Sequence, residues 1–246
     1  MNREKITLSP LVFDDIGLSS AAKKVLLFAQ NKESALIVTP NGVMAKHAME
    51  SLSFCTVLQK ASLTLPDGVG VTLAARLMQT PFQNGRVTGV SLGIEVARLA
   101  AQEGLSVFFL GGRPGVAQKA ASNLKKRYPT LQIAGVSHGY RNDVRTLTEH
   151  IKQSGASILF CCLGSPRQEF LAATFSQNLS CPILCLGGSL DVYAEISKRA
   201  PLFWQTIGCE WLWRTLQEPS RINRLPALFS FSLIFLQRSA KKLLQS

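Results

Sequence analysis

Short apolar runs recur along the chain, and most of them end in a loop that contains glycine. The runs cover residues 35–38, 63–65, 107–110, 133–136, 158–163 and 183–186. They are apolar throughout instead of alternating, which is typical of parallel strands buried on both faces. Segments of helical periodicity separate most runs, the clearest at residues 20–28, 116–128 and 144–152. The pattern predicts an α/β fold: a Rossmann-like, mainly parallel sheet with helices on both faces.

The loops after the predicted strands form the edge where a ligand is expected, because open α/β sheets bind ligands outside the carboxyl ends of their strands. They cover residues 39–41, 66–68, 111–115, 137–140, 164–169 and 187–189. Five of the six contain glycine, which permits a tight turn or a close approach to a ligand. Each loop also precedes a predicted helix, whose free N–H groups favour anions. We therefore expect one pocket with several phosphate-binding walls.

The character of the chain changes near its C-terminal end, where three tryptophans and an interrupting proline precede an apolar segment at residues 225–236. This change predicts a core of residues 1–197 and a helical appendage of residues 198–246. The apolar segment is bounded by Arg224 and Arg238. It is too short to span a bilayer but suits the membrane interface, with its basic residues toward anionic headgroups. A helix buried against the core is the alternative.

The composition fits one large domain with a sizeable core, since the chain has 246 residues of which 46% are hydrophobic. No stretch approaches the ~20 apolar residues of a transmembrane helix, and the N-terminal residues lack the pattern of a signal peptide. A cytoplasmic location is therefore expected. The six cysteines show no paired Cys-x-x-Cys spacing, so we expect buried thiols and not disulfides or zinc ligands.

The net charge of +12 indicates an anionic partner: nucleic acid, anionic lipid or a phosphorylated substrate. The last 33 residues alone hold +5 of this excess. Nucleic acid is disfavoured as the partner because the basic residues of this C-terminal part lie beside an apolar segment, and because no nucleic-acid-binding motif is present. The charge therefore favours an anionic membrane surface and a phosphorylated substrate.

Asp67 is the only carboxylate between Glu50 and Glu95, and it follows a predicted strand. An isolated acid at a strand end is a candidate general base. The same Pro66-Asp67-Gly68 string also fits an ordinary turn, because each of its residues is favoured there for backbone reasons. The residues alone leave both interpretations open. His138, in its own strand-end loop, is the next candidate for a base.

The string at residues 111–115 invites a dinucleotide interpretation, but it matches neither Gly-x-Gly-x-x-Gly nor a P-loop. Gly111 and Gly112 can let a phosphate approach the backbone, and Arg113 adds positive charge beside a helix N-terminus. A nucleoside diphosphate is therefore favoured over a nicotinamide dinucleotide.

The string at residues 164–169 lacks the Gly-x-Ser-x-Gly spacing of a nucleophile elbow, and no acid and histidine complete a relay, which excludes a serine hydrolase. We expect Ser165 to cap a helix that begins at Pro166. Gln168 then lies in the first helical turn, where its side chain can point into the pocket.

No metal or other cofactor is expected. The three histidines share no ligand spacing, no Asp-x-Asp pair is present, and the consecutive acids Asp14 and Asp15 lie far upstream. If the chain transfers a sugar from a nucleotide donor, arginines and helix N-termini must stabilise the leaving diphosphate.

Together these strings resemble the WecG/TagA/CpsF family of bacterial glycosyltransferases over residues 8–224, nearly the whole chain. The most specific are Gly-Gly-Ser-Leu-Asp-Val, Lys-Arg-Ala-Pro, Glu-Trp-Leu-Trp-Arg and Glu-Pro-Ser-Arg, at residues 187–192, 198–201, 210–214 and 218–221. Residues 39–41, 66–68, 86–89 and 164–169 add support. One departure is Ser91, where the family usually has an Asp; this position is expected to cap the next helix, and Ser can do the same.

The resemblance implies an inverting, metal-independent transfer of a hexose derivative, most naturally N-acetylmannosamine, from a UDP-sugar. The acceptor would be undecaprenyl-diphosphate-linked N-acetylglucosamine at the inner face of the cell membrane, in cell-surface polysaccharide or teichoic acid synthesis. Asp67 would be the base, with Thr39 and Asn41 beside it. The implied substrate-binding residues are Arg86, Gln168, Gly188 and Asp191, with Arg214, Arg221 and Arg224 closing over the lipid diphosphate. A non-catalytic module that binds a nucleotide sugar or a lipid diphosphate remains the alternative.

Overall fold

The computed structural model describes residues 5–140, 143–197, 200–201, 204, 212–213, 231 and 233–237. It begins with an antiparallel hairpin of β1 (Lys5–Leu8) and β2 (Leu11–Asp14), which the sequence analysis missed. Burial alternates along both strands, but Leu11, Val12 and Phe13 are all apolar, so the sequence does not show this alternation in β2.

A second sheet forms the centre of the molecule and has six parallel strands in the order β4-β3-β8-β7-β5-β6. The strands are β3 (Ala35–Val38), β4 (Leu63–Thr64), β5 (Ser106–Gly111), β6 (Gln132–Ser137), β7 (Ile158–Cys162) and β8 (Pro182–Cys185). All six predicted strands are confirmed, because an unbroken apolar run is what a strand buried on both faces requires.

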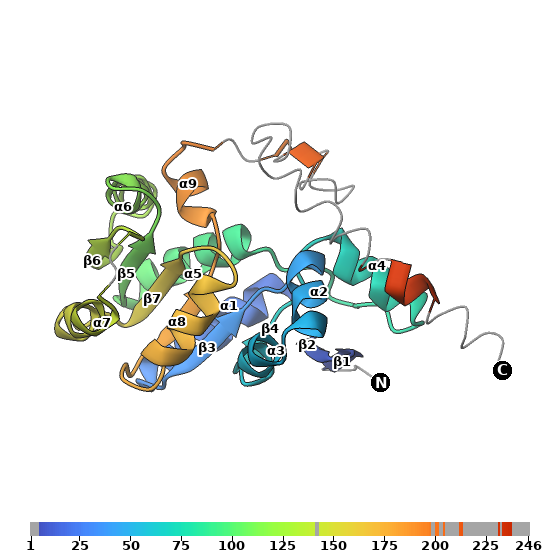
Figure 1. Ribbon diagram of the computed structural model, residues 1–246. Coiled ribbons are helices and arrows are strands. Elements are labelled where there is room, and N and C mark those ends of the chain that lie inside the picture. The colour runs from blue at the N-terminus through green and yellow to red at the C-terminus, as the bar shows by residue number, and fades with distance from the viewer. Residues whose placement is uncertain are drawn as a thin grey trace.

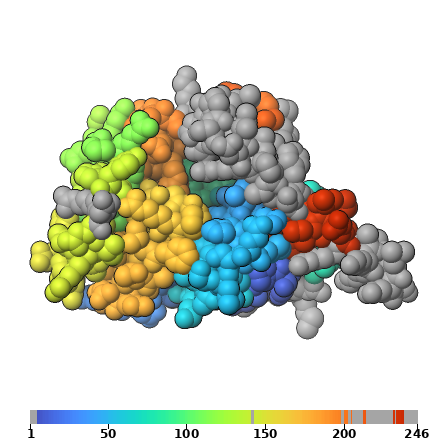
Figure 2. All heavy atoms as spheres, in the orientation of Figure 1, coloured from blue at the N-terminus to red at the C-terminus, as the bar shows by residue number. Residues whose placement is uncertain are grey.

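Helices cover both faces of this sheet, as predicted (Figure 1). One face carries α1 (Leu18–Gln30), α5 (Gly89–Glu103), α6 (Val116–Arg127) and α9 (Ser189–Tyr193). The other carries α2 (Gly42–Glu50), α3 (Leu52–Gln59), α4 (Val69–Leu77), α7 (Val144–Gln153) and α8 (Arg167–Phe175). In Figure 2, α8 (gold) adjoins the blue residues of α2 and α3 on this second face. Successive residues of β7 point to opposite faces of the sheet. Phe160 packs against the helices of the first face and Leu159 against those of the second.

The order of the strands creates four places where a ligand can enter between helices. The helix after β8 (α9) packs on one face, whereas the helices after its neighbours β3 and β7 (α2 and α8) pack on the other. The helix after β5 (α6) likewise packs opposite the helices after its neighbours β7 and β6 (α8 and α7). Such switch points are where open α/β sheets bind ligands at their carboxyl edge.

The described part of the C-terminal segment packs partly into the core. Phe231 and Phe235 are buried in the same cluster as α4, whereas Leu233 and Leu236 are each 53% exposed. This short helical segment (red) lies beside α4, at the end of the molecule remote from α6 and α7 (Figure 1). The expectation that the apolar segment lies in the membrane interface is therefore wrong for the two phenylalanines. Among the described residues, no helix has the length and apolar character needed to cross a bilayer.

Candidate active site

Two neighbouring strand ends and the start of α5 meet at one corner of the sheet. Since β3 and β4 are parallel neighbours, the loops after them leave from the same edge. The Asp67 backbone N–H donates to the Pro40 carbonyl at 3.1 Å, and the Val87 N–H donates to the Pro66 carbonyl at 2.9 Å. These bonds join the loop that holds Asp67 to the loop after β3 and to the segment that holds Arg86.

Asn41 adjoins the Asp67 loop and begins α2. Its Oδ1 accepts hydrogen bonds from the backbone N–H groups of Val43 and Met44, at 3.0 and 3.1 Å. A Cβ atom on Gly68 would lie 3.5 Å from the Asn41 Cβ. The oxygen is thus occupied by the helix cap. The amide nitrogen, which makes no hydrogen bond within the described part of the chain, is the group that can donate to a ligand.

Thr39 lies where β3 ends and α5 begins, and it is only 7% exposed. A Cβ atom on Gly89, the first residue of α5, would lie 3.3 Å from Thr39 Oγ1 and 3.4 Å from the Leu186 carbonyl oxygen. The helix therefore starts against the ends of both β3 and β8 because its first residue has no side chain. Its N-terminal N–H groups carry partial positive charge at this corner.

The cap of α5 is Thr88 and not Ser91, so the expectation for Ser91 is wrong. Thr88 Oγ1 accepts from the Ser91 N–H at 3.2 Å, and its hydroxyl donates to Ser91 Oγ at 3.0 Å. Ser91 occupies the third helical position, where an acidic or polar side chain supports the cap from within the first turn. The physical reason is that the chain becomes helical at Gly89, one residue after Thr88.

Gln168 ties the end of β7 to the end of β8. Its side chain is 3% exposed; Oε1 accepts from the Gly187 N–H at 2.9 Å, and Nε2 donates to Glu169 Oε1 at 2.6 Å. Its backbone carbonyl accepts from the thiols of Cys161 and Cys185. Gln168 therefore holds the glycine-rich loop after β8 in place. A ligand can contact only the hydrogen-bonding capacity that these two bonds leave on its side-chain amide.

The expected Ser165 cap is not present, because Pro166 is the N-cap residue of α8 and no side chain caps the helix. The Ser165 side chain instead lies beside the Glu169 carboxylate. Glu169 is fully buried, and this burial raises its pKa, while the hydrogen bond from Gln168 and the nearby Ser165 side chain oppose the rise. The sequence analysis missed Glu169, whose one visible signal was its place directly after Gln168.

The prediction of buried thiols is confirmed for five of the cysteines. They are Cys55, Cys161, Cys162, Cys181 and Cys185, all free and buried. Burial raises the pKa of the Cys181 thiol to about 12 and those of Cys161 and Cys185 well above their usual range. These thiols are therefore packing residues, since the reactive form is the thiolate. Cys209 lies outside the described residues.

The second group of predicted residues gathers at the ends of β5 and β6. Gly111 has φ 139°, and a Cβ atom there would lie 2.1 Å from the Cys162 carbonyl oxygen, so only glycine fits. The Gly112 carbonyl accepts from the Gly139 N–H at 2.9 Å, which joins the two loops. Arg113 is exposed just before α6. This arrangement gives a backbone-lined wall with one cation at its rim.

His138 follows β6, whereas Asp67 follows β4, and these strands are the opposite edges of the six-stranded sheet. Five strand spacings separate them by about 24 Å. His138 Nδ1 accepts from the Tyr140 N–H at 3.2 Å, within its own loop. His138 therefore lies at the opposite end of this edge from Asp67. The predicted residues occupy two stations along one edge of the sheet: the β3–β4 corner and the ends of β5 and β6.

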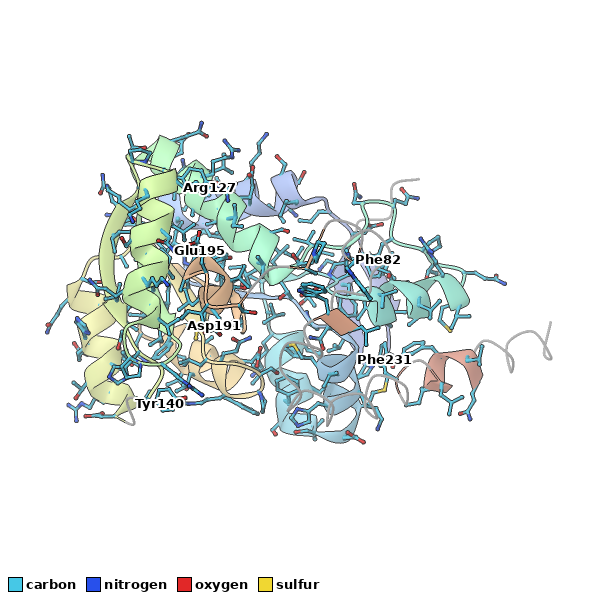
Figure 3. All side chains as sticks on the ribbon, turned by 90° about the horizontal axis from the view of Figure 1, so that it is seen from above. Phe82, Arg127, Tyr140, Asp191, Glu195 and Phe231 are labelled. Atoms are coloured by element: carbon cyan, nitrogen blue, oxygen red, sulfur yellow. The ribbon has the colours of Figure 1, made fainter. Side chains whose placement is uncertain are left out.

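Asp191 and Gly188 lie at the start of α9, after β8. Gly188 is the N-cap residue of this short helix, and Asp191 is half-buried in its first turn. Figure 3 shows Asp191 in the same half of the molecule as Tyr140, with Phe82 and Phe231 in the other half. Its helix α9 packs against α6, the helix that follows β5, which associates Asp191 with the β5–β6 station.

Comparison with known proteins decides the family. The sequence profile of the WecG/TagA/CpsF glycosyl transferase family matches residues 6–245. The chain belongs to this family. It is therefore a glycosyltransferase.

Several relatives are named N-acetylglucosaminyldiphosphoundecaprenol N-acetyl-beta-D-mannosaminyltransferase. The protein of Bacillus spizizenii is 35% identical over 197 residues, covering 80% of this chain and 76% of the relative. That of Staphylococcus aureus strain MW2 is 28% identical over 247 residues, covering 98% and 96%. That of Bacillus subtilis is 28% identical over 216 residues, covering 87% and 84%.

For this WecG/TagA/CpsF member, the structure groups four of the residues singled out from the sequence at the β3–β4 corner: Thr39, Asn41, Asp67 and Arg86. Arg214, Arg221 and Arg224 lie outside the described residues. Among the residues that the structure describes, no group of three or more His, Cys, Asp or Glu side chains could hold a metal ion.

Proposed function

We propose that the chain transfers N-acetylmannosamine from a UDP-sugar to undecaprenyl-diphosphate-linked N-acetylglucosamine, with inversion and without a metal ion. The acceptor and the sugar follow the name shared by its relatives. The observation that carries the proposal is the placement of Asp67 beside Asn41, Thr39 and the N-terminus of α5. A carboxylate and an anion-binding helix end at one corner are what a transfer from a diphosphate donor needs.

In the proposed reaction, Asp67 removes the proton from the acceptor hydroxyl as its oxygen attacks the anomeric carbon. The bond from that carbon to the diphosphate breaks on the opposite face, so one displacement inverts the configuration. General base catalysis of this kind contributes roughly 10²–10⁴-fold in rate. The beta linkage in the relatives' name agrees with inversion of an alpha-linked donor.

The negative charge that develops on the leaving diphosphate requires preorganised donors. Arg86 and the first N–H groups of α5 serve this role in the proposal, and Asn41 and Thr39 orient the reacting sugar. The uridine part of the donor then extends toward the β5–β6 station, which carries Gly111, Gly112, Arg113, His138, Gly188 and Asp191. Gln168 lies between the two stations, because β7 and β8 lie between the sheet edges.

We further propose that residues 198–246 form an appendage that attaches the enzyme to the inner face of the cell membrane. The support is the excess charge of the last 33 residues and the exposure of Leu233 and Leu236. Basic and apolar contacts together give stable but reversible attachment. Arg214, Arg221 and Arg224 would contact the acceptor diphosphate.

The test is a screen of UDP-sugars against one lipid-linked N-acetylglucosamine diphosphate, with and without EDTA. We expect turnover with UDP-N-acetylmannosamine, a beta-linked product, and an unchanged rate in the chelator. Tight UDP binding without turnover of any donor would favour the non-catalytic binding module. A rate that EDTA abolishes and Mn²⁺ restores would contradict the metal-independent mechanism.

A further inference from the structure

The two consecutive acids at the end of β2 hold two different segments of the β3–β4 corner. Phe13, just before them, is buried and packs edge to face against Phe82, with ring centroids 5.9 Å apart. Asp14 and Asp15 follow, one half-buried and the other 4% exposed. Neither acid is assigned a role in the reaction proposed above.

Asp14 holds strand β4. Its Oδ2 accepts from the Thr64 backbone N–H at 2.8 Å. β4 is the edge strand and pairs with β3 on one side only, so this N–H points to the open side of the sheet. A single carboxylate oxygen satisfies it. Asp67, the proposed base, follows three residues later.

Asp15 holds the loop that leads to Arg86. Its Oδ2 accepts from the Gln83 N–H at 2.9 Å, and its Oδ1 accepts from the Asn84 N–H at 3.0 Å. The Asn84 side chain also donates to the Asp15 carbonyl at 2.8 Å. Both carboxylate oxygens are thus occupied by consecutive backbone N–H groups, two and three residues before Arg86.

The two bonds from Gln83 and Asn84 to the Asp15 carboxylate form a clamp, and the chain from this clamp to Arg86 is short and fixed. Gly85 turns the chain with φ 74°, a conformation that favours glycine. Beyond Arg86, the Val87 N–H is bound to the Pro66 carbonyl at 2.9 Å. The backbone of Arg86 is therefore held from both sides, by Asp15 before it and by the Asp67 loop after it.

We propose that Asp15 is a positioning residue for Arg86: it fixes the backbone from which the guanidinium reaches the leaving diphosphate. This inference rests on the proposed function for the role of Arg86. Asp15 acts through the loop and does not touch the substrate. Its removal leaves the N–H groups of Gln83 and Asn84 without their protein acceptor and lets the loop move, so Arg86 loses its geometry while Asp67 keeps its own.

Asparagine substitutions at the two acids form a matched pair. In Asp14→Asn the amide oxygen can still accept the single bond from Thr64. In Asp15→Asn only one oxygen remains for two backbone donors, and the amide NH₂ faces the other N–H. We expect kcat/KM for transfer to fall at least tenfold in Asp15→Asn and to stay within twofold in Asp14→Asn. The milder Asn84→Ala keeps the Asp15 carboxylate, and its kcat/KM should fall between two- and tenfold.

A double-mutant cycle separates positioning from general destabilisation. If Asp15 acts through Arg86, the pair Asp15→Asn with Arg86→Ala is within twofold of Arg86→Ala alone. Amide hydrogen exchange at residues 83–86 should also be faster in Asp15→Asn, with residues 64–67 unchanged. Multiplicative losses in the cycle, or wild-type activity in both Asp15→Asn and Asn84→Ala, would overturn the inference.

Two further outcomes are decided by the same measurements. If Asp15→Asn does not fold, Asn84→Ala takes its place in the cycle and in the exchange experiment. If the wild-type protein transfers no sugar, the proposed function fails. The clamp is then judged by exchange alone, and unchanged protection of residues 83–86 in the variant would refute it.

Discussion

Gln168 and Glu169 are adjacent residues whose side chains bind each other: Gln168 Nε2 donates to Glu169 Oε1 at 2.6 Å, while Gln168 Oε1 accepts from the Gly187 N–H. Because a carboxylate can only accept, Glu169 fixes which end of the Gln168 amide faces Gly187. The loop after β8 is thus oriented by a fully buried acid that has no cation partner among the described residues.

Replacement of Gln168 should therefore damage the loop after β8. Gln168→Leu leaves the Gly187 N–H without its acceptor, which costs about 1–3 kcal/mol of unfolding free energy. We expect kcat/KM to fall at least tenfold as well. Chemical denaturation and steady-state kinetics measure the two effects. Gln118→Leu, at an exposed position on α6, is the matched control and should change neither.

Glu169 should give the protein a stability that decreases with rising pH. Burial raises its pKa above the usual 4.5, so the folded protein holds this proton more tightly than the unfolded chain. The free energy of unfolding should then fall from about pH 4.5 up through the raised pKa and level off above it.

Glu169→Gln tests this dependence, because the amide oxygen still accepts from Gln168 and cannot ionise. The variant should lose the Glu169 part of the slope and be at least as stable as the wild type at neutral pH. Urea unfolding at several values between about pH 5 and pH 8 measures it. Glu149→Gln on the surface is the control. An identical slope in wild type and Glu169→Gln would contradict the assignment.

Asp67→Asn should reduce transfer by at least about 10²-fold, since the amide keeps the shape but cannot accept the proton. UDP binding should stay within a few fold of wild type, because the base is not expected to hold the nucleotide. Single-turnover kinetics and calorimetric titration with UDP separate the two effects. A kcat within threefold of wild type would remove Asp67 from the role of base.

Gly111 is expected to tolerate no side chain. In Gly111→Ala the new Cβ would meet the Cys162 carbonyl oxygen at 2.1 Å, so neighbouring strands must separate. A loss at the upper end of the usual 1–3 kcal/mol for overpacking should result. Gly115 also has a positive φ, 86°, but nothing lies within 4 Å of a Cβ atom there, so Gly115→Ala measures backbone strain without a close contact. Equal losses in the two variants would show that the close strand contact is unimportant.

Membrane attachment should depend on the exposed leucines of the C-terminal segment and not on its buried phenylalanines. Leu233→Ser with Leu236→Ser should weaken binding to anionic liposomes without loss of stability. Leu27→Ser, at an equally exposed site on α1, should not. Phe235→Ala should instead cost about 3–5 kcal/mol of unfolding free energy, because its side chain is buried in the core. Liposome sedimentation and thermal unfolding distinguish these outcomes.

The unbroken apolar runs were sufficient to predict the six strands, the loops at their carboxyl ends and Asp67 as a candidate base, because such patterns are local properties of the chain. The hairpin of β1 and β2 was not predicted, because Leu11-Val12-Phe13 is apolar throughout and only its burial in the structure alternates.

The strand order, by contrast, was decided only in three dimensions. It makes neighbours of β3 and β8, far apart in the sequence, and sends Asp67 and His138 to opposite edges. Tertiary packing also decided three further features: the burial of Phe231 beside α4, the hydrogen bonds from Asp15 to the loop before Arg86, and the bond between Gln168 and Gly187. Each depends on which distant backbone groups and surfaces meet when the helices pack, and no periodicity along the chain encodes that meeting.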